Sequence, residues 1–201
     1  MKYVRGWFFV LTILLSSSFV FAQPLMQKGP DYQIGDRLVS QPDKAADEFR
    51  EITWDDLIPP DWPPEDLLSG LFDDDDLDEL EDTDPKAVEY LTKLRELWDA
   101  APVVEKMNGQ HVRLPGFVVP LEGNDKEIRE FLLVPYFGAC IHVPPPPANQ
   151  LIHVLPDRSI NADLNMMPIW VNGVLTVDRY DSEMGNAAYR MQGIRIEPYQ
   201  E

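Results

Sequence analysis

The chain has 201 residues, of which 35 are acidic and 17 basic, and a formal net charge of −18 at pH 7. It contains no basic stripe, which excludes phosphate-driven binding of nucleic acid and adhesion to anionic lipid, because both need clustered Lys and Arg. The acidity is concentrated in residues 43–84, which hold 18 acidic residues against two basic ones. This distribution permits a basic protein partner or weak attraction for cations, and it predicts no nucleic-acid partner.

The first 22 residues have the three-part pattern of a secretory signal peptide. Lys2 and Arg5 precede an apolar run from Trp7 to Leu15, and Val20-Phe21-Ala22 provides a cleavage sequence. An uncleaved membrane anchor is the alternative, but the apolar run is short for a bilayer and three serines follow it. We therefore expect cleavage after Ala22, a periplasmic mature protein, and no membrane span after cleavage.

Two segments lie between the predicted signal peptide and the acidic run that precedes the first predicted helix. Residues 23–48 are polar without periodicity, which predicts a flexible, loosely ordered leader. Residues 49–64 carry large apolar side chains, so we expect an aromatic arm that docks on the domain rather than remaining in water. The side chains are Phe49, Ile52, Trp54, Leu57, Ile58 and Trp62. A linear motif that docks on a partner is the alternative.

Residues 65–84 contain a dense run of Asp and Glu, which predicts a solvated acidic linker because like charges repel. Residues 85–100 form the clearest predicted helix, with Asp84 as its N-cap and Pro85 in its first turn. Apolar residues recur there at spacings of three and four and form one stripe. The stripe consists of Val88, Leu91, Leu94, Leu97, Trp98 and Ala101.

After Pro102 the pattern changes from helix to strands, so residues 85–201 form one predicted helix-plus-β domain. Five strands are predicted, over His111–Leu121, Glu130–Phe137, Leu151–Leu155, Ile169–Val177 and Ala188–Glu197. Asn172-Gly173 is alternatively a hairpin turn that splits the fourth strand. Short strands with glycine breaks predict a mainly β fold, a small five-stranded OB-like barrel with one N-terminal α-helix. A small β-sandwich is the alternative.

A cysteine and a histidine precede four consecutive prolines. An extended backbone would place Cys140 and His142 on the same face, since side chains alternate along a strand. His153 lies in the next predicted strand, within reach of that face, whereas His111 lies in the first. Cysteine and histidine suit zinc or copper, so Cys140, His142 and His153 are candidate metal ligands. Their spacing matches no strong zinc pattern, and a purely structural loop is the alternative.

The proline run stiffens the backbone beside these side chains. It predicts a binding loop made of Pro144, Pro145, Pro146, Pro147, Asn149 and Gln150. Because Cys140 is the only cysteine, no disulfide can form within the chain. Thiol catalysis at Cys140 is a further alternative, but no motif provides the oriented base and oxyanion hole that it needs. We therefore expect a protein that is not an enzyme.

Several segments resemble an exported proteobacterial family of unknown function. They are Trp54–Leu57, Arg113-Leu-Pro-Gly-Phe-Val-Val-Pro-Leu121, Glu130–Pro135, Cys140-Ile-His-Val-Pro-Pro-Pro-Pro-Ala-Asn-Gln150 and Pro168–Gly173. The resemblance implies a periplasmic protein associated with an envelope transport system, and it brings no known activity or functional residues. The sequence thus predicts a non-catalytic binding or accessory protein with an envelope protein partner. A protein that binds or traffics zinc or copper is the alternative.

Overall fold

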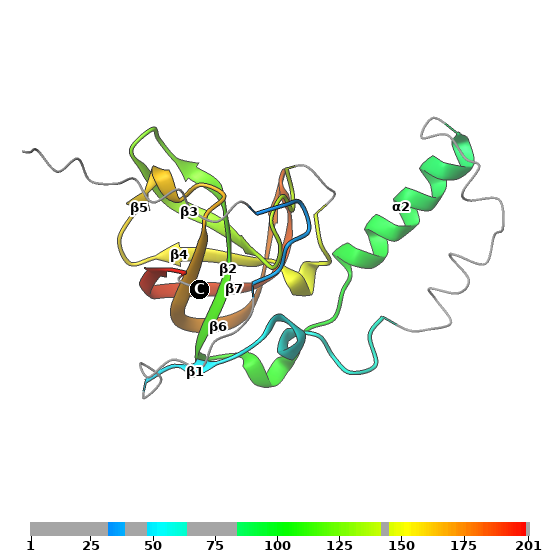
Figure 1. The fold of residues 1–201 in the computed structure, drawn as a ribbon. Coiled ribbons are helices and arrows are strands. Elements are labelled where there is room, and N and C mark those ends of the chain that lie inside the picture. Colours follow the sequence, from blue (N-terminus) through cyan, green and yellow to red (C-terminus); the bar gives the residue numbers. More distant parts are fainter. Residues whose placement is uncertain (1–31, 39–47, 64–83, 142–144, 200–201) are drawn as a thin grey trace, which may run out of the picture. The chain divides into compact units, whose positions relative to one another are not determined.

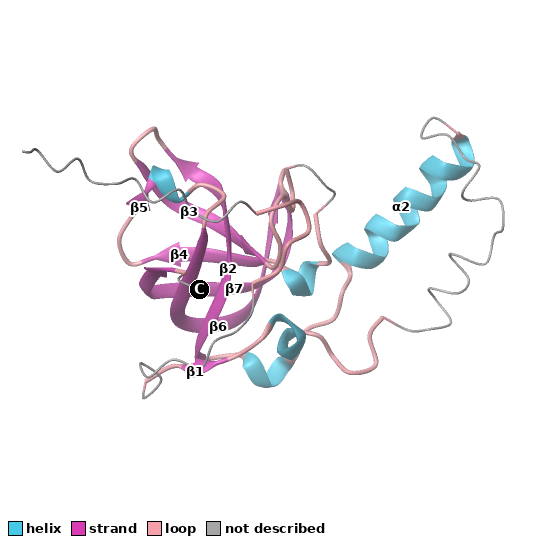
Figure 2. Cartoon of the chain, viewed as in Figure 1, coloured by secondary structure: helices cyan, strands magenta, loops and turns pink. Residues whose placement is uncertain are grey.

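The structure is a computed structural model that describes residues 32–38, 48–63, 84–141 and 145–199. The predicted signal peptide and nearly all of the predicted acidic linker lie outside these ranges. The described residues form a β-sheet, one α-helix and short 3-10 helices (Figures 1 and 2). The helix is α2 (Pro85–Asp99). The strands are β1 (Arg50–Glu51), β2 (Gln110–Gly123), β3 (Glu127–Val134), β4 (Ile152–Pro156), β5 (Ile160–Asn161), β6 (Pro168–Ser182) and β7 (Gly185–Pro198).

The seven strands form one mixed sheet in the order β1-β2-β6-β7-β4-β3-β5. β2 also pairs with β3, so the pairings pass from β2 through β6, β7, β4 and β3 and return to β2. The pairs β1–β2 and β4–β7 are parallel and the others are antiparallel. A mainly β fold with one α-helix in the described residues is therefore confirmed. The strand number differs from the predicted five, because β1 and β5 contain two residues each and such short strands carry no periodic pattern.

Asn172 and Gly173 lie inside β6 and do not form a hairpin turn. The register of β6 against β7 shifts between them, which marks a β-bulge. A Cβ atom on Gly173 would collide with the carbonyl oxygen of Gln192 on β7. This glycine therefore allows a close approach of two strands, and the predicted split of the strand is wrong.

The aromatic arm docks on the domain. Phe49, Ile52 and Leu57 are at most 1% exposed. Trp54 is also buried, and its indole Nε1 donates a hydrogen bond to the carbonyl oxygen of Pro115 on β2 at 2.8 Å. β1 pairs in parallel with β2 beside this contact. The arm is therefore part of the hydrophobic core.

One tyrosine hydroxyl connects the arm to two other parts of the domain. The Tyr189 hydroxyl on β7 donates to the carbonyl oxygen of Leu57 at 3.0 Å and accepts from the amide of Val104 at 2.7 Å. The side chain of Gln150 donates to the carbonyl oxygen of Trp54 at 2.8 Å. Backbone groups of the arm that would otherwise be buried without partners are satisfied in this way.

Part of the predicted leader is also ordered against the domain. Arg37 forms a β-bridge with Tyr136, and its guanidinium lies 5.8 Å from the centre of the Tyr136 ring. The ring of Tyr32 packs edge-on against Phe117, with 5.2 Å between centroids, and stacks on Phe137. Residues 32–38 of the predicted leader therefore contact the domain through aromatic side chains.

Helix α2 starts and ends as predicted. The carboxylate of Asp84 caps it by accepting from the amide of Lys86 at 2.8 Å. Its other end is held by Arg179 on β6, whose guanidinium donates to the carbonyl oxygens of Asp99 at 2.7 Å and Ala101 at 3.0 Å. None of the residues of α2 is buried. No helix in the described ranges is long and apolar enough to cross a membrane.

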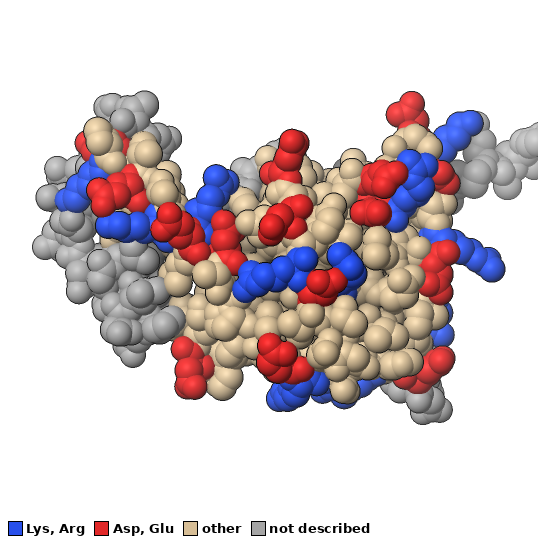
Figure 3. All heavy atoms as spheres, turned by 180° about the vertical axis from the view of Figure 1, so that it is seen from behind, with Lys and Arg blue, Asp and Glu red and all other residues tan. Residues whose placement is uncertain are grey.

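The sheet buries two groups of apolar side chains. The larger group includes the arm, and the smaller one consists of Phe117, Val119, Leu132, Val134, Ala139, Leu151 and Ala187. On the face drawn in Figure 3, acidic and basic side chains are interspersed and form no large patch of one sign. The excess of negative charge lies mainly in residues 43–84, as the composition indicates.

Two matched leucine substitutions compare a buried position in the docked arm with an exposed position on α2. We expect Leu57→Ala to lower the free energy of unfolding by about 2–5 kcal/mol, because it leaves a cavity in the core. Leu91→Ala on α2 should change it by no more than about 0.5 kcal/mol, since Leu91 is 57% exposed. Urea unfolding followed by circular dichroism measures both. Equal losses in the two variants would contradict this assignment of buried and exposed surfaces.

Candidate functional site

Cys140 lies in a turn and not in a strand. After β3 ends, the chain reverses through two turns, in which Ala139 donates to the carbonyl of Tyr136 and Ile141 to that of Gly138. Gly138 and Cys140 both have a positive φ, of 86° and 65°. The extended backbone that would place Cys140 and His142 on one face is therefore absent at Cys140. A residue with side chain rarely adopts this left-handed conformation, and surrounding contacts must hold it there.

The sulfur of Cys140 is half-buried beside the smaller apolar group. Gly185 lies close to this sulfur, since a Cβ atom added to Gly185 would be 3.8 Å from it. The same added atom would be 2.9 Å from Leu151 and 3.0 Å from Pro145, so the space around Gly185 is filled. Burial raises the pKa of the Cys140 thiol to about 12. The thiol is therefore protonated at neutral pH, which opposes its use as a nucleophile.

His153 on β4 is almost fully buried, at 2% exposure. Its ring stacks on Tyr180 with 3.7 Å between centroids, and its Nε2 lies 3.1 Å from a carboxylate oxygen of Glu130 on β3. Since an ionised carboxylate only accepts hydrogen bonds, Nε2 carries the proton and donates to Glu130. The other ring nitrogen, Nδ1, is buried and has no hydrogen-bond partner among the residues that the structure describes.

The predicted metal ligands are only partly described. The side chains of Ile152 and Val154 project from one face of the sheet into the larger apolar group. The side chain of His153, between them in sequence, projects from the other face. His142 lies outside the described residues, and His111 stacks on Phe49 instead. Among the residues that the structure describes, no group of three or more His, Cys, Asp or Glu is arranged to hold a metal ion. A site made of Cys140, His142 and His153 thus stays a prediction.

The predicted binding loop divides into two parts with different roles. Asn149 and Gln150 lie in a 3-10 helix, Ala148–Gln150, and both side chains are buried. The Asn149 amide donates to the carbonyl oxygen of Pro102 at 2.9 Å, and Gln150 holds the arm as described above. These two amides therefore stabilise the fold from inside. Pro144 lies outside the described residues.

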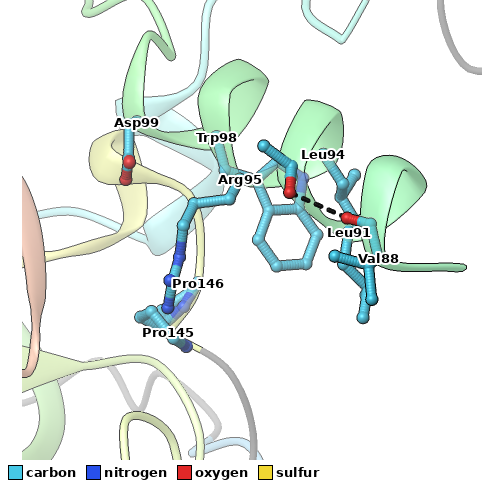
Figure 4. A pocket seen from close by; sticks show the side chains of 9 residues that line it. Val88, Leu91, Leu94, Arg95, Trp98, Asp99, Pro145 and Pro146 are labelled. Carbon is cyan, nitrogen blue, oxygen red and sulfur yellow. Dashed lines mark hydrogen bonds between the residues drawn. The ribbon is translucent and has the colours of Figure 1, made fainter. Parts of the chain in front are cut away.

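Pro145 and Pro146, by contrast, form one wall of a groove whose other wall is α2. The groove has a volume of about 420 Å³. Its apolar lining consists of Val88, Leu91, Leu94, Trp98, Pro145 and Pro146. Figure 4 shows the Arg95 side chain extending from α2 to the two prolines. We call this feature the α2–proline groove.

The lining of the α2–proline groove is mainly apolar and includes three polar residues. Thr92, Arg95 and Asp99 complete its lining, and the Thr92 hydroxyl is bonded to the helix carbonyl of Val88 at 2.7 Å (Figure 4). Leu91 is 57% exposed. Sequence periodicity located the apolar stripe of α2, but no sequence signal showed that Pro145 and Pro146 would face it.

The environment of His153 predicts a pH dependence of stability. Burial lowers the pKa of His153, although Glu130 and Asp178 act in the opposite direction. Arg190, which pairs with Asp178, lowers it further. The folded chain therefore binds fewer protons than the unfolded chain between the lowered pKa and about 6.5, so stability falls as pH decreases through that range.

Urea unfolding between pH 7.5 and pH 5 measures this loss. In His153→Gln, which cannot titrate, we expect a smaller loss of stability over the same range, and His111→Gln is the matched control. An unchanged pH dependence in the His153 variant would show that the ring protonates as easily in the folded chain as in the unfolded one.

The raised pKa of the half-buried Cys140 thiol predicts slow alkylation. We expect iodoacetamide at pH 7.5 to modify Cys140 at least about tenfold more slowly in the native chain than in urea, because a thiol with a raised pKa forms little thiolate. Elemental analysis of the same sample distinguishes a protonated thiol from one that is protected by zinc or copper. Rapid native alkylation would contradict the burial of this sulfur.

Comparisons with known proteins place the chain in a family. Residues 54–198 match the model of a family described as protein of unknown function (DUF3299). A crystal structure of a DUF3299 family protein from Pseudomonas aeruginosa is similar to this chain, with a TM-score of 0.58 and 37% sequence identity, covering 76% of this chain and 97% of that chain. Curated proteins yield no match. The resemblance to an uncharacterised family is confirmed, and the chain belongs to the DUF3299 family.

Proposed function

We propose that this protein is an exported, non-catalytic binding protein that holds an apolar segment of an envelope protein partner. The segment binds in the α2–proline groove. The observation that carries the proposal is that α2 has an apolar stripe and yet none of its residues is buried. A helix with this pattern normally packs its stripe against another part of the protein.

The exposed stripe has an energetic cost. Apolar surface left in water is unfavourable by roughly 25 cal/mol per Å². Val88 and Leu91 are 51% and 57% exposed and lie next to each other along the helix. A contiguous apolar surface with a polar rim is typical of an interaction site, whereas single exposed apolar residues such as Ile194 need no explanation.

The groove walls are held in place before any partner binds. Arg179 fixes the last turn of α2, and Asn149 fixes Pro102, which follows the helix. Pro145 and Pro146 have restricted backbone angles. A preformed groove binds more tightly than a mobile one, because less conformational entropy is lost on binding.

The sheet supports this function as a scaffold. We infer that the closed series of pairings through β2, β6, β7, β4 and β3 is the small OB-like barrel that the sequence predicts. Barrels of this kind commonly present binding surfaces. Because fold alone does not determine function, the proposal rests on the groove and not on the barrel. The signal-peptide pattern supports export to the periplasm.

Site-specific photo-crosslinking in the native host envelope tests the proposal. A photoreactive amino acid at position 92, which lines the groove, should yield an adduct with one envelope protein. The same amino acid at position 194, which is exposed but outside the groove, should yield no such adduct. Leu91→Ser should reduce the adduct at position 92 at least about fivefold without changing the amount of folded protein. Identical adducts at both positions, or no effect of Leu91→Ser, would contradict binding in the groove.

A further inference from the structure

We infer that the segment which binds the α2–proline groove is a cationic amphipathic helix of the partner protein. This inference rests on the proposed function, because it names the chemistry of the partner at the same groove. It follows from the shape of the apolar lining and from the charge of this chain.

The lining matches a helix in shape. The exposed apolar residues Val88 and Leu91 follow each other at a spacing of three, and Leu94 and Trp98 continue the row. α2 has 15 residues and is therefore about 22 Å long. A row of this length accepts the apolar face of a helix of three to four turns, which is a common mode of peptide recognition. Pro145 and Pro146 cannot offer a free backbone amide, so their wall does not favour an added β-strand.

The charges on α2 itself do not select a partner. The helix carries Lys86, Lys93 and Arg95 against Glu89, Glu96 and Asp99. Lys93 and Glu89 form an ion pair at 2.8 Å, but both side chains are more than half exposed and the pair contributes little to stability. Selection by charge must therefore come from the rest of the chain.

The sequence immediately before α2 is strongly acidic. Residues 73–82 contain eight Asp and Glu, and Asp82 lies two positions before the helix cap, Asp84. Asp82 is separated from the helix cap by one residue, so the acidic run adjoins the start of α2 in the sequence. A basic partner segment would be attracted and an acidic one repelled, which affects specificity and association rate more than the area of contact does.

The same charge argues against a second copy of this chain in the groove. Each copy has a net charge of −18, and like net charges oppose association. A cationic helix, in contrast, reduces the charge of the complex. The occupant that fits both the apolar lining and the charge is therefore a helix with Leu-like residues on one face and Lys or Arg on the other.

Fluorescence anisotropy with three labelled 18-residue peptides tests this inference on the full chain after export, at 150 mM salt. The first peptide is an amphipathic helix of Leu and Lys, the second has Glu in place of Lys, and the third contains the same Leu and Lys residues in an order without a helical stripe. We expect the first peptide to bind at least about tenfold more tightly than either of the others.

Two variants assign the binding to the groove. Leu91→Ser should weaken binding of the first peptide at least about fivefold, and Ile194→Ser, an exposed apolar residue outside the groove, should leave it unchanged. Circular dichroism checks that both variants fold. Trp98→Ala provides a second groove variant with the same expected loss.

The outcomes separate this inference from the proposed function. If the Lys and Glu peptides bind equally and Leu91→Ser weakens both, the groove binds helices but charge does not select them, and the inference is wrong. If the peptide without a stripe binds as tightly as the first and Leu91→Ser has no effect, binding is only electrostatic and both proposals fail. A concentration-dependent dimer in sedimentation that Leu91→Ser abolishes would assign the groove to a second copy and overturn the inference.

Discussion

The hydroxyl group of Tyr189 is the contact on which the rest of the arrangement depends. It joins β7 to the aromatic arm through Leu57 and to the segment that follows α2 through Val104. Three parts of the chain that are far apart in sequence meet at one buried oxygen. A buried hydroxyl with both a donor and an acceptor partner fixes position as well as adding stability. Gln150 adds a second connection, from the 3-10 helix after the prolines to the arm.

This arrangement accounts for the position of α2, none of whose residues is buried. The arm occupies the core beside β2, and the hydrogen bonds of Asn149 and Arg179 hold the exit from α2. The helix therefore leaves the domain at a fixed point, with Pro145 and Pro146 beside it. The apolar residues of the arm fold inward, whereas four of those on α2 line the groove. Two segments of similar hydrophobicity thus have different roles because only one of them has a place in the core.

The two types of apolar segment also show what could be predicted from the sequence. Large aromatic residues among prolines are the sequence signal for a docked arm, because exposed Trp and Phe are costly in water. Asp84 and Pro85 predicted the start of α2, and alternation predicted the positions of the five longer strands. Because side chains alternate along β4, His153 projects from one face of the sheet and its sequence neighbours project from the other.

Other features had no local signal. The two-residue strands depend on partners that are distant in sequence, and so does the ordering of residues 32–38 against Phe117 and Tyr136. The turn at Cys140 replaces an extended segment because the chain reverses after β3, and a left-handed cysteine is not recognisable from composition. Periodicity indicates that a helix has an apolar face, but it does not indicate whether that face is covered. This is why the groove appeared only with the structure.

Hydroxyl-radical footprinting of the free full chain, read by mass spectrometry, tests most directly whether the stripe on α2 is uncovered. The account predicts that Leu91 is oxidised at a rate close to that of an exposed leucine, while Leu57 in the arm is protected by at least about tenfold. If Leu91 is protected as strongly as Leu57 in a dilute monomer, the chain covers its own helix. The α2–proline groove would then not be available to a partner.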